Sequence, residues 1–490
     1  MDLLAEFPFW LRTSHWINAF FLGLLARAGI QILAALPKLY WKEGAVPGTE
    51  WLKFTRKQLP TDRVWISLEE EIEVPTLIAQ PGGNNLGLGR HWHFFSALFW
   101  ILNGAVYVVF LFATDEWRRL LPTSWSVFPD ALRTAWDYLT FHAPPADSFN
   151  PYDPLQQLSY AGVVFLLAPF LILTGLAQSP AITARYPGYS KIFGGRQKAR
   201  SLHFLGLVAM VLFTVGHTVM VFVNGPKVNF GNIMLGQHES SGWLALILGL
   251  CLIAAIFLVY GLTSWLSLRQ PRLVQRALGY VLTRARQLWP ERLESRQEYS
   301  RRDISPLFRV NGYPPDTDEY SALAAEDFRD WRLRVGGLVE RPQELTLGDI
   351  RYLTQQSQIT RHNCIQGWSA VGEWTGLPLI TLLDLCSPLP AARYLIFWSL
   401  QRDESGRPFY ESLAMRFARQ PQTMLAYELN GEALDVPHGA PLRLRVETQL
   451  GFKMVKWLDR IEFVDDFRRF RDGMGGSRED LMYYDWTAGI

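Results

Sequence analysis

The sequence contains little cysteine, little charge and almost no net charge. Three cysteines in 490 residues are too few for a disulfide framework, so any thiol chemistry would depend on a single cysteine. Charged residues make up 19% of the chain, below the roughly 25% of typical soluble domains. The 48 Lys and Arg nearly balance the 46 Asp and Glu, and the resulting net charge of +2 gives no reason to expect a nucleic-acid partner.

Long apolar runs, by contrast, are abundant, and all of them lie before residue 270. Runs of about 20 residues are long enough to cross a bilayer core of ~30 Å. Four runs are free of charge, and the fifth contains only Arg27, which in a bilayer has to snorkel, pair or face a polar cofactor. The predicted spans are Thr13–Leu36, Trp92–Ala113, Leu158–Ala177, Leu202–Val223 and Gly242–Leu268.

The chain divides into three parts by composition. The first apolar run is long and has no basic leader or small-residue cleavage site, so we expect it to stay as a membrane helix. Residues 269–304 are Arg-rich, as suits a basic juxtamembrane linker. From about residue 305, short strand-like runs alternate with Gly, Pro and acidic residues. The predicted fold is an all-α transmembrane bundle of about five spans (1–268), the linker (269–304) and a soluble α+β domain (305–490), with strands at Trp331–Val335, Tyr394–Ser399, Pro441–Val446 and Arg460–Val464.

Basic residues are unevenly distributed among the loops. Loop 179–200 carries five basic residues and no acid, and connection 37–90 carries seven basic residues. On the opposite side, loop 114–155 has three basic residues against six acidic ones. Because loops rich in Lys and Arg stay in the cytoplasm, we expect a multi-pass protein of the bacterial inner membrane whose C-terminal domain is cytoplasmic.

Four histidines lie within or at the ends of the apolar runs: His15, His93, His203 and His217. A lone histidine on an apolar helix is usually a core residue, but four in one membrane region favour ligation of a metal. His203 and His217 are 14 residues apart on one helix, hence ~21 Å apart along its axis and within about 40° of the same face.

The order of the spans selects partners for these two histidines. His93 is level with His203 at one membrane surface, and His15 is level with His217 at the other. The sequence therefore predicts two bis-histidine sites, each able to bind a low-spin b-type haem. His91 is an alternative to His93 on a different helical face, and His93 is preferred because it lies deeper in the span.

The segments around these histidines, "SHWINAF", "RHWHFF" and "LHFLGLVAMVLFTVGHTVMVF", resemble those of the di-haem cytochrome b subunits of bacterial formate dehydrogenases and nickel-iron hydrogenases. The resemblance covers residues 1 to about 225 and implies electron transfer to or from quinone in the membrane. The chain differs from that family by its longer connection 37–90 and by its fifth span.

One cysteine stands in an unusual setting. Cys251 in the fifth span and Cys386 in an apolar run are most simply buried small hydrophobic residues. Cys364, in "TRHNCIQGW", follows Arg361, His362 and Asn363, whose cations and amide would favour a thiolate. Composition alone leaves a structural and a functional role for Cys364 equally open.

The C-terminal part contains the segments "FRVNGYPPDT", "WRLRVGGLVERP", "RHNCIQGWSAVGEWTGLPL", "LAYELNGEAL", "HGAPLRLRV" and "GFKMVKWL". In order and separation they resemble the sulfite-oxidase-type molybdopterin family, especially its methionine-sulfoxide-reductase-like branch, over nearly all of residues 305–470. The resemblance implies an oxidoreductase that transfers an oxygen atom at molybdenum. The reductase branch also implies a periplasmic domain, in conflict with the cytoplasmic side that the loop charges predict.

The same resemblance implies roles for individual residues. Cys364 would donate its thiolate to molybdenum, and a soft thiolate suits such a metal. The other residues implied to hold the cofactor are Arg361, His362 and Asn363 beside it, His438, Arg443 and either Lys453 or Lys456 at the pterin phosphate, and Asn311 near the pocket mouth. Arg309 would face an oxyanion substrate, although its register against the family arginine is shifted by one, which leaves the substrate open.

Together these features predict a membrane-bound molybdenum oxidoreductase with two b haems, fused in one chain and exchanging electrons with quinone in the lipid. The favoured reaction is reduction of a small S- or N-oxide. Two alternatives remain, namely oxidation of a sulfite-like donor into the quinone pool and a non-catalytic haem sensor or electron conduit.

Overall fold

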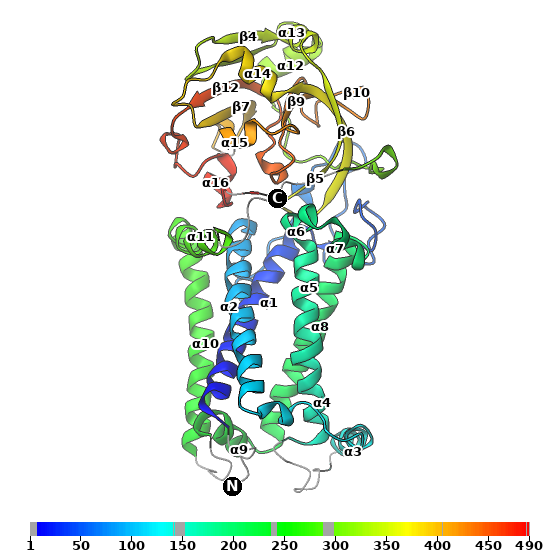
Figure 1. The fold of residues 1–490 in the computed structure, drawn as a ribbon, viewed down its shortest axis with the longest axis vertical. Coiled ribbons are helices and arrows are strands. Elements are labelled where there is room, and N and C mark those ends of the chain that lie inside the picture. Colours follow the sequence, from blue (N-terminus) through cyan, green and yellow to red (C-terminus); the bar gives the residue numbers. More distant parts are fainter. Residues whose placement is uncertain are drawn as a thin grey trace.

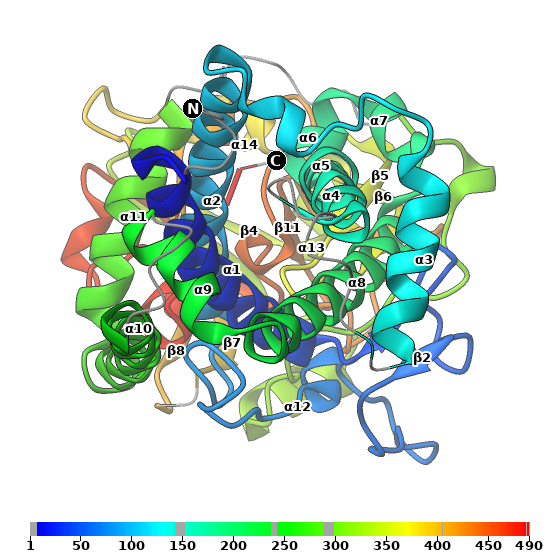
Figure 2. The same ribbon diagram turned by 90° about the horizontal axis from the view of Figure 1, so that it is seen from below.

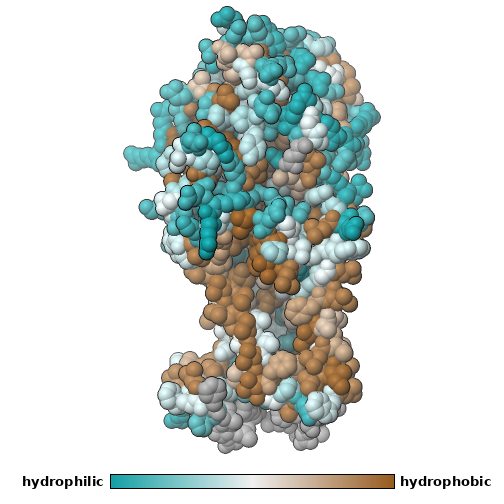
Figure 3. All heavy atoms as spheres, turned by 180° about the vertical axis from the view of Figure 1, so that it is seen from behind, coloured by the Kyte–Doolittle hydropathy of each residue, from teal (hydrophilic) through white to brown (hydrophobic). Residues whose placement is uncertain are grey.

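The computed structural model describes residues 7–140, 142, 152–236, 243–287, 298–403, 405–486 and 488–489. A bundle of long helices carries a strand-rich domain on one of its ends (Figure 1). Five helical stretches are long and apolar enough to cross a membrane, as predicted. They are α1 (Phe9–Ala35), α2 (Leu86–Ala113), α4 to α5 (Pro154–Gln178), α8 (Arg196–Val223) and α10 (Trp243–Arg269). Figure 3 shows hydrophobic side chains over the bundle, below a mostly hydrophilic upper part.

The third span is interrupted before its proline. α4 (Pro154–Gly162) and α5 (Ala168–Gln178) are joined by the π-helical turn η5 (Val163–Leu167). Pro169 has no N–H to donate to the preceding turn, and a wider turn accommodates its ring without ending the helix. The helix thus continues through Pro169, which lies inside the predicted span Leu158–Ala177.

Short helices cover both ends of the bundle (Figure 1). At the far end lie η3 (Glu116–Arg119), α3 (Val127–Leu139), α9 (Pro226–Phe230) and η6 (Gly231–Leu235). Beneath the strand-rich domain lie α6 (Pro180–Arg185), α7 (Pro187–Ile192) and α11 (Pro271–Gln287), the last within the basic linker. In the view along the bundle, α1 and α2 lie between α10 on one side and α5 and α8 on the other (Figure 2).

Arg27, the single charge in the predicted run Thr13–Leu36, forms hydrogen bonds within the protein. Arg27 donates hydrogen bonds to the carbonyls of Thr76 at 2.6 Å and Ala79 at 3.0 Å and to Ser264 Oγ at 2.9 Å. Of the possibilities left open by the sequence, pairing is therefore the one observed. The Arg27 side chain ties the connection after the first span to α1 and α10.

The C-terminal domain contains two five-stranded sheets. One runs in the order β10-β9-β6-β5 with β11 paired to β9, and the other in the order β4-β3-β12-β7-β8. Among the strands of the described residues, only β3 and β12 pair in parallel. The strands are β3 (Arg332–Gly337), β4 (Gln343–Thr346), β5 (Gln356–Asn363), β6 (Ser369–Pro378), β7 (Tyr394–Arg402), β8 (Pro408–Ala414), β9 (Met424–Leu429), β10 (Glu432–Ala433), β11 (Arg443–Arg445) and β12 (Leu458–Val464). The helices are α12 (Asp318–Ala325), α13 (Leu347–Tyr352), α14 (Leu379–Cys386), α15 (Met415–Ala418) and α16 (Ser477–Met482).

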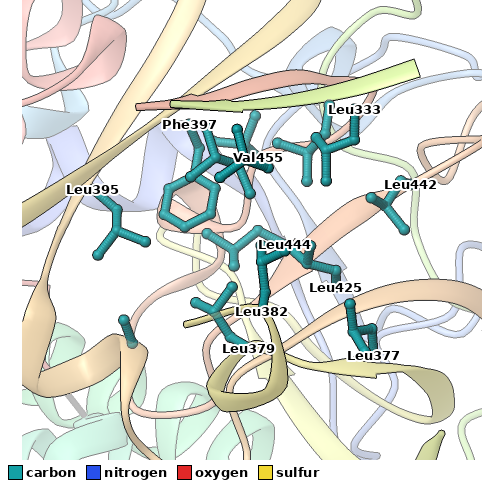
Figure 4. Close-up of a cluster of buried hydrophobic side chains, with 14 of the residues drawn as sticks. Leu333, Leu377, Leu379, Leu382, Leu395, Phe397, Leu425, Leu442, Leu444 and Val455 are labelled. Carbon is teal, nitrogen blue, oxygen red and sulfur yellow. The ribbon is translucent and has the colours of Figure 1, made fainter. Parts of the chain in front are cut away.

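The domain core lies between these sheets. Leu333 and Phe397 from one sheet face Leu425 and Leu444 from the other, with α14 alongside (Figure 4). Cys386 is buried in this cluster, as expected. The same expectation was wrong for Cys251, which lies exposed on α10, because α10 has apolar residues on every side and only part of its surface packs on the bundle.

The two halves share a buried interface. One apolar cluster combines Leu36 and Tyr40, which follow the first span, with Cys364, Trp368 and Tyr484 of the C-terminal domain. Polar contacts continue the interface, since Gln275 of α11 donates to the Tyr484 carbonyl at 2.8 Å. The connection between the first two spans, residues 36–85, includes the short elements β1 (Lys38–Leu39), β2 (Leu52–Lys53) and η2 (Ser67–Glu70). Buried contacts of this kind hold the halves in one arrangement.

Candidate functional site

Two pairs of histidine rings face each other inside the helix bundle. The ring centroids of His15 on α1 and His217 on α8 are 6.1 Å apart. Those of His93 on α2 and His203 on α8 are 6.5 Å apart. Two imidazoles that share one metal ion, each through a nitrogen at about 2 Å, have centroids roughly 6 Å apart. Each pair therefore has the spacing and the donor type that a bis-histidine metal site needs.

Contacts from the third span orient the two histidines of α8. Thr174 Oγ1 lies 3.1 Å from His203 Nδ1, and Tyr160 OH lies 3.3 Å from His217 Nδ1. A partner at Nδ1 sets the ring orientation and leaves Nε2 as the nitrogen available to a metal. Gly175 leaves space beside the His203 ring, since a Cβ at this position would lie 3.4 Å from His203 Cε1.

His91 lies on another side of α2. Its Nδ1 is 2.9 Å from the Gly87 carbonyl, and its Nε2 is 3.8 Å from where Gly279 of α11 would carry a Cβ. The His91 ring therefore packs toward α11, whereas His93 is the α2 histidine that faces His203.

A pocket lies in the C-terminal domain beside the turn that follows β5. Its walls are formed by Phe308, Arg309, Asn311, Gly312, His362, Gln401, Phe409, His438, Arg443, Gly451, Phe452, 454–457 and Arg478. Asn311 connects this pocket to the turn, because its Nδ2 lies 3.5 Å from Cys364 Sγ. The structure thus brings together several of the residues that the sequence assigned to a molybdenum cofactor.

Cys364 is fully buried in this turn, which is closed by a hydrogen bond of 3.0 Å from its N–H to the Trp368 carbonyl. Burial raises the pKa of the Cys364 thiol to about 12, although Arg196 and Arg309 act in the opposite direction. The expectation that neighbouring cations and amides would favour the thiolate was therefore wrong, because desolvation outweighs them. A bound metal ion would supply the missing positive charge, since a coordinating thiol is deprotonated outright.

His362 and Asn363 end β5 just before this cysteine, and both are buried. The His362 ring lies between aromatic neighbours, 5.4 Å from the ring of Trp368, and its Nδ1 is 3.0 Å from Arg445 Nη1. Desolvation and the nearby arginines hold the pKa of His362 well below its usual value, so the ring is neutral. Gly451 packs directly on this ring, and a Cβ there would collide with it.

Cations without carboxylate partners line the other side of the pocket. Arg443 Nη1 donates to the His438 carbonyl at 2.8 Å, and Lys456 Nζ donates to the Pro437 carbonyl at 2.7 Å. Neither forms an ion pair in the described part of the chain, and desolvation lowers the pKa of both well below their ordinary values. Desolvated cations of this kind favour an anionic ligand. This arrangement fits the phosphate of a pterin cofactor.

Lys453 does not join this group. Its ammonium lies 2.9 Å from Glu411 Oε2 and 2.5 Å from Glu479 Oε1, and all three side chains are at most 2% exposed. Of the two lysines that the sequence offered for the pterin phosphate, only Lys456 lines the pocket. Lys453 instead holds η8 (Gly451–Lys453) against β8 and α16.

Two predicted site arginines are occupied by the connection between the first two spans. Arg361 pairs with Glu43 at 2.6 Å and also donates to Ser369 Oγ at 3.1 Å, so it belongs to the interface between the halves. Arg309 lines the pocket, but its guanidinium is bound by the Glu70 carboxylate. An Arg309 cation free to face an oxyanion substrate is not what the structure shows.

The N-terminus of α8 contacts the turn that carries Cys364. Arg196 Nη1 donates to Ser369 Oγ at 3.0 Å, and Gln197 Nε2 donates to the Gly367 carbonyl at 2.9 Å. The same helix carries His203 and His217 farther along. A single element therefore reaches from the cysteine turn to both histidine pairs.

Sequence reasoning missed the residues of this junction, namely Arg196, Gln197, Gln366, Glu70 and Glu71. Gln366 links Glu71 Oε1, at 2.7 Å from its Nε2, to Cys364 Sγ, at 3.5 Å from its Oε1. The unusual length of connection 37–90 and its acidic run at 69–71 were the available signals.

Comparisons with known proteins agree with this division into halves. Residues 6–230 match the family model for prokaryotic cytochrome b561, and residues 320–469 match that for the oxidoreductase molybdopterin binding domain. A protein of Azospira oryzae, provisionally named as the protein-methionine-sulfoxide reductase subunit YedZ1, is 34% identical over 38% of this chain and 64% of its own length. The protein-methionine-sulfoxide reductase catalytic subunit MsrP of Xanthomonas axonopodis pv. citri is 34% identical over 30% of this chain and 49% of its own length.

Among solved structures, the sulfane dehydrogenase SoxCD of Paracoccus pantotrophus covers 31% of this chain and 40% of its own, with 28% identity and a TM-score of 0.26, too low to place any element. The chain spans about half to two thirds of the length of the curated relatives it matches. The two family matches and the five apolar helices describe a multi-pass membrane protein that joins a cytochrome b561-type region to a molybdopterin-binding oxidoreductase domain in one chain.

Proposed function

We propose that this chain is a membrane-bound molybdenum oxidoreductase that reduces an S- or N-oxide with electrons from membrane quinol, passed through two b haems. The contact between Gln197 of α8 and the Gly367 carbonyl carries the proposal, because it joins the helix of His203 and His217 to the turn of Cys364. The relatives named as protein-methionine-sulfoxide reductases support the direction and the substrate class.

In the bundle, His93 with His203 and His15 with His217 would each hold one haem through their imidazoles. The haems supply single-electron transfer when bound. The helices hold the two imidazole rings of each pair at a distance that suits a shared metal ion. Thr174 orients the ring of His203, and Tyr160 orients the ring of His217.

In the C-terminal domain, Cys364 would bind molybdenum, which supplies oxygen-atom transfer coupled to two electrons. Asn311, His362 and Asn363 would line that metal, and Arg443 and Lys456 would hold the pterin phosphate. His438 would instead position Arg443, which donates to the His438 carbonyl at 2.8 Å. Both ring nitrogens of His438 are already engaged, since Nδ1 lies 2.6 Å from Asp435 Oδ1 and Nε2 lies 3.0 Å from the Phe308 carbonyl. The reaction balances as oxide plus two electrons and two protons giving the reduced substrate and water.

The order of the electron carriers follows from α8. His203 is six residues from Gln197, whereas His217 lies 14 residues beyond His203. At 1.5 Å per residue, the His93–His203 pair is ~21 Å closer to the Cys364 turn than the other pair is. The nearer pair would deliver electrons to molybdenum, and quinol would reduce the haems from the lipid. By loop charge, the molybdenum domain faces the cytoplasm of a bacterial inner membrane, which a C-terminal reporter fusion tests.

Anaerobic reoxidation tests the function. The purified chain is assayed for iron and molybdenum, its haems are reduced with dithionite, and sulfoxides and N-oxides are added in turn while the haem spectrum is followed. We expect two haems and one molybdenum per chain, and reoxidation by at least one oxide, with Cys364→Ser as the unreactive control. Haem without molybdenum would indicate an electron conduit, and haem reduction by sulfite in the oxidised protein would indicate the reverse reaction.

A further inference from the structure

The connection between the first two spans supplies part of the wall around Arg309. The Arg309 side chain is fully buried, and every group that it contacts by hydrogen bond comes from this connection. Nη1 donates to the Glu70 carboxylate, and Nη2 donates to Tyr40 OH at 3.2 Å and to the Ala45 carbonyl. The Trp65 ring lies 5.4 Å from the guanidinium carbon. The membrane half thus binds a side chain that lines the pocket of the other half.

These contacts leave Arg309 without the geometry that binds oxyanions. An arginine binds an oxyanion best through two parallel N–H groups on one edge of its guanidinium. Both donors of Nη2 and one donor of Nη1 are engaged, and only Nε has no partner in the described part of the chain. No edge with two free donors remains. Two N–H groups are left, one on Nε and one on Nη1, and because each lies on a different edge, each suits a single neutral acceptor oxygen.

The charge of Arg309 is offset as well. Glu70 Oε2 forms an ion pair with Arg309, and Glu70 Oε1 lies 2.6 Å from Lys38 Nζ. The side chains of Arg309, Glu70 and Lys38 are all at most 6% exposed. Glu71 follows directly and is also buried, and its carboxylate accepts from Gln366 at 2.7 Å. Two cations and two carboxylates therefore balance within this wall. The cations without carboxylate partners, Arg443 and Lys456, lie near His438 and are assigned to the pterin phosphate.

The connection also orders the turn that carries Cys364. Gln366 Oε1 accepts from Ser67 Oγ at 2.7 Å and from Trp368 Nε1 at 3.2 Å. Its Nε2 donates to the Ser67 carbonyl at 3.2 Å and to Glu71. Ser67 N–H in turn donates to the Val310 carbonyl at 2.9 Å, one residue after Arg309. Residues 67–71 thus fix both Arg309 and the Cys364 turn.

We propose that Glu70, supplied by the membrane half, sets the charge of the substrate by occupying Arg309, so that the pocket takes neutral oxides and rejects oxyanions such as sulfite and sulfate. This inference rests on the proposed function for its reaction but concerns anion binding, which is measured without turnover. It assigns a specificity role to a residue that lies outside the molybdopterin-binding domain.

Isothermal calorimetry tests the proposal. Sodium sulfate is titrated into the full chain in detergent, with its molybdenum cofactor and haems bound. Glu70→Gln should bind sulfate at least about tenfold more tightly than the wild type, the amount that a charged hydrogen-bonding partner contributes. Glu70→Gln combined with Arg309→Gln should lose that gain. Glu69→Gln is the matched control, because Glu69 is adjacent but pairs with the exposed Arg63 at 2.6 Å; it should bind sulfate as weakly as the wild type.

Two results would overturn the proposal. One is sulfate binding to Glu70→Gln that equals that of the wild type. The other is saturable binding of sulfate to the wild type, if Arg309→Gln abolishes that binding. This second result would refute the proposal even if Glu70→Gln does not fold. Failure of the proposed function would appear separately, as haems that no oxide reoxidises, and it would leave the sulfate titration unaffected.

Discussion

Replacing Lys453 with methionine should destabilise the C-terminal domain, whereas replacing Lys456, three residues later, should release the cofactor. The Lys453 ammonium lies between the carboxylates of Glu411 and Glu479, with all three side chains buried. Methionine keeps much of the side-chain length but leaves two buried carboxylates without a cation. Removing one partner from a buried ion pair costs about 3–5 kcal/mol. For a domain of this size, that lowers Tm by roughly 6–20 °C.

The loss of stability in Lys453→Met should depend on pH. Burial and the neighbouring Glu479 hold the pKa of Glu411 well above its ordinary value of 4.5, and Lys453 acts in the opposite direction. A carboxyl whose pKa is raised by folding contributes stability at low pH and loses it as the pH rises through the raised pKa. Loss of the lysine raises the pKa further. The variant should therefore be closest to the wild type near pH 5 and farthest from it at pH 8.

Thermal unfolding of the full chain in detergent, followed by near-ultraviolet circular dichroism, measures the stability, and elemental analysis measures molybdenum. Lys456→Met is the matched comparison. Lys456 forms no ion pair in the described residues and its pKa is lowered by desolvation, so its loss should leave Tm unchanged while the molybdenum content falls. A Lys453→Met protein with normal Tm and no molybdenum would refute the division between the two lysines.

Three further variants test the assignment of the centres. Cys364→Ala should abolish oxide reduction and leave the haem spectrum unchanged, and loss of haem from this variant would contradict the separation of the two halves. His217→Ala should remove one haem of two, with His91→Ala as a control that keeps both; unchanged haem stoichiometry in His217→Ala would disprove the pairing. Gln197→Ala should slow haem reoxidation by an oxide several-fold without changing haem content, since its amide joins α8 to the Cys364 turn; an unaltered rate would show that this contact carries no electrons.

The five spans could be predicted because apolar length is a local property of the sequence. Their ends were less predictable. α8 begins at Arg196, six residues before the apolar run starts at Leu202, because its first turns leave the bilayer and bind the C-terminal domain. The strands Tyr394–Arg402 and Leu458–Val464 were likewise found from runs of branched and aromatic residues.

The roles of individual cations were harder to predict, because they depend on contacts between residues far apart in the chain. Motif resemblance offered Arg309 and Lys453 as pocket cations. Their carboxylate partners, Glu70 and Glu411, lie 239 and 42 residues away. No local pattern tells which carboxylate a buried cation will meet, and that partner decides whether the charge is available to a ligand. The thiol of Cys364 follows the same rule, since its burial decides its pKa.

Fusion of the two halves fixes the junction geometrically as well as covalently. Arg196, Gln197, His203 and His217 belong to one continuous helix, so their spacing is set by its rise of 1.5 Å per residue. In a complex of separate chains, electron delivery would depend on an encounter and on its affinity. Here the contact with the Cys364 turn is intramolecular, and its effective concentration does not change when the protein is diluted. The rate of haem reoxidation at a given oxide concentration should therefore be independent of protein concentration, whereas assembly from two subunits would make it fall on dilution.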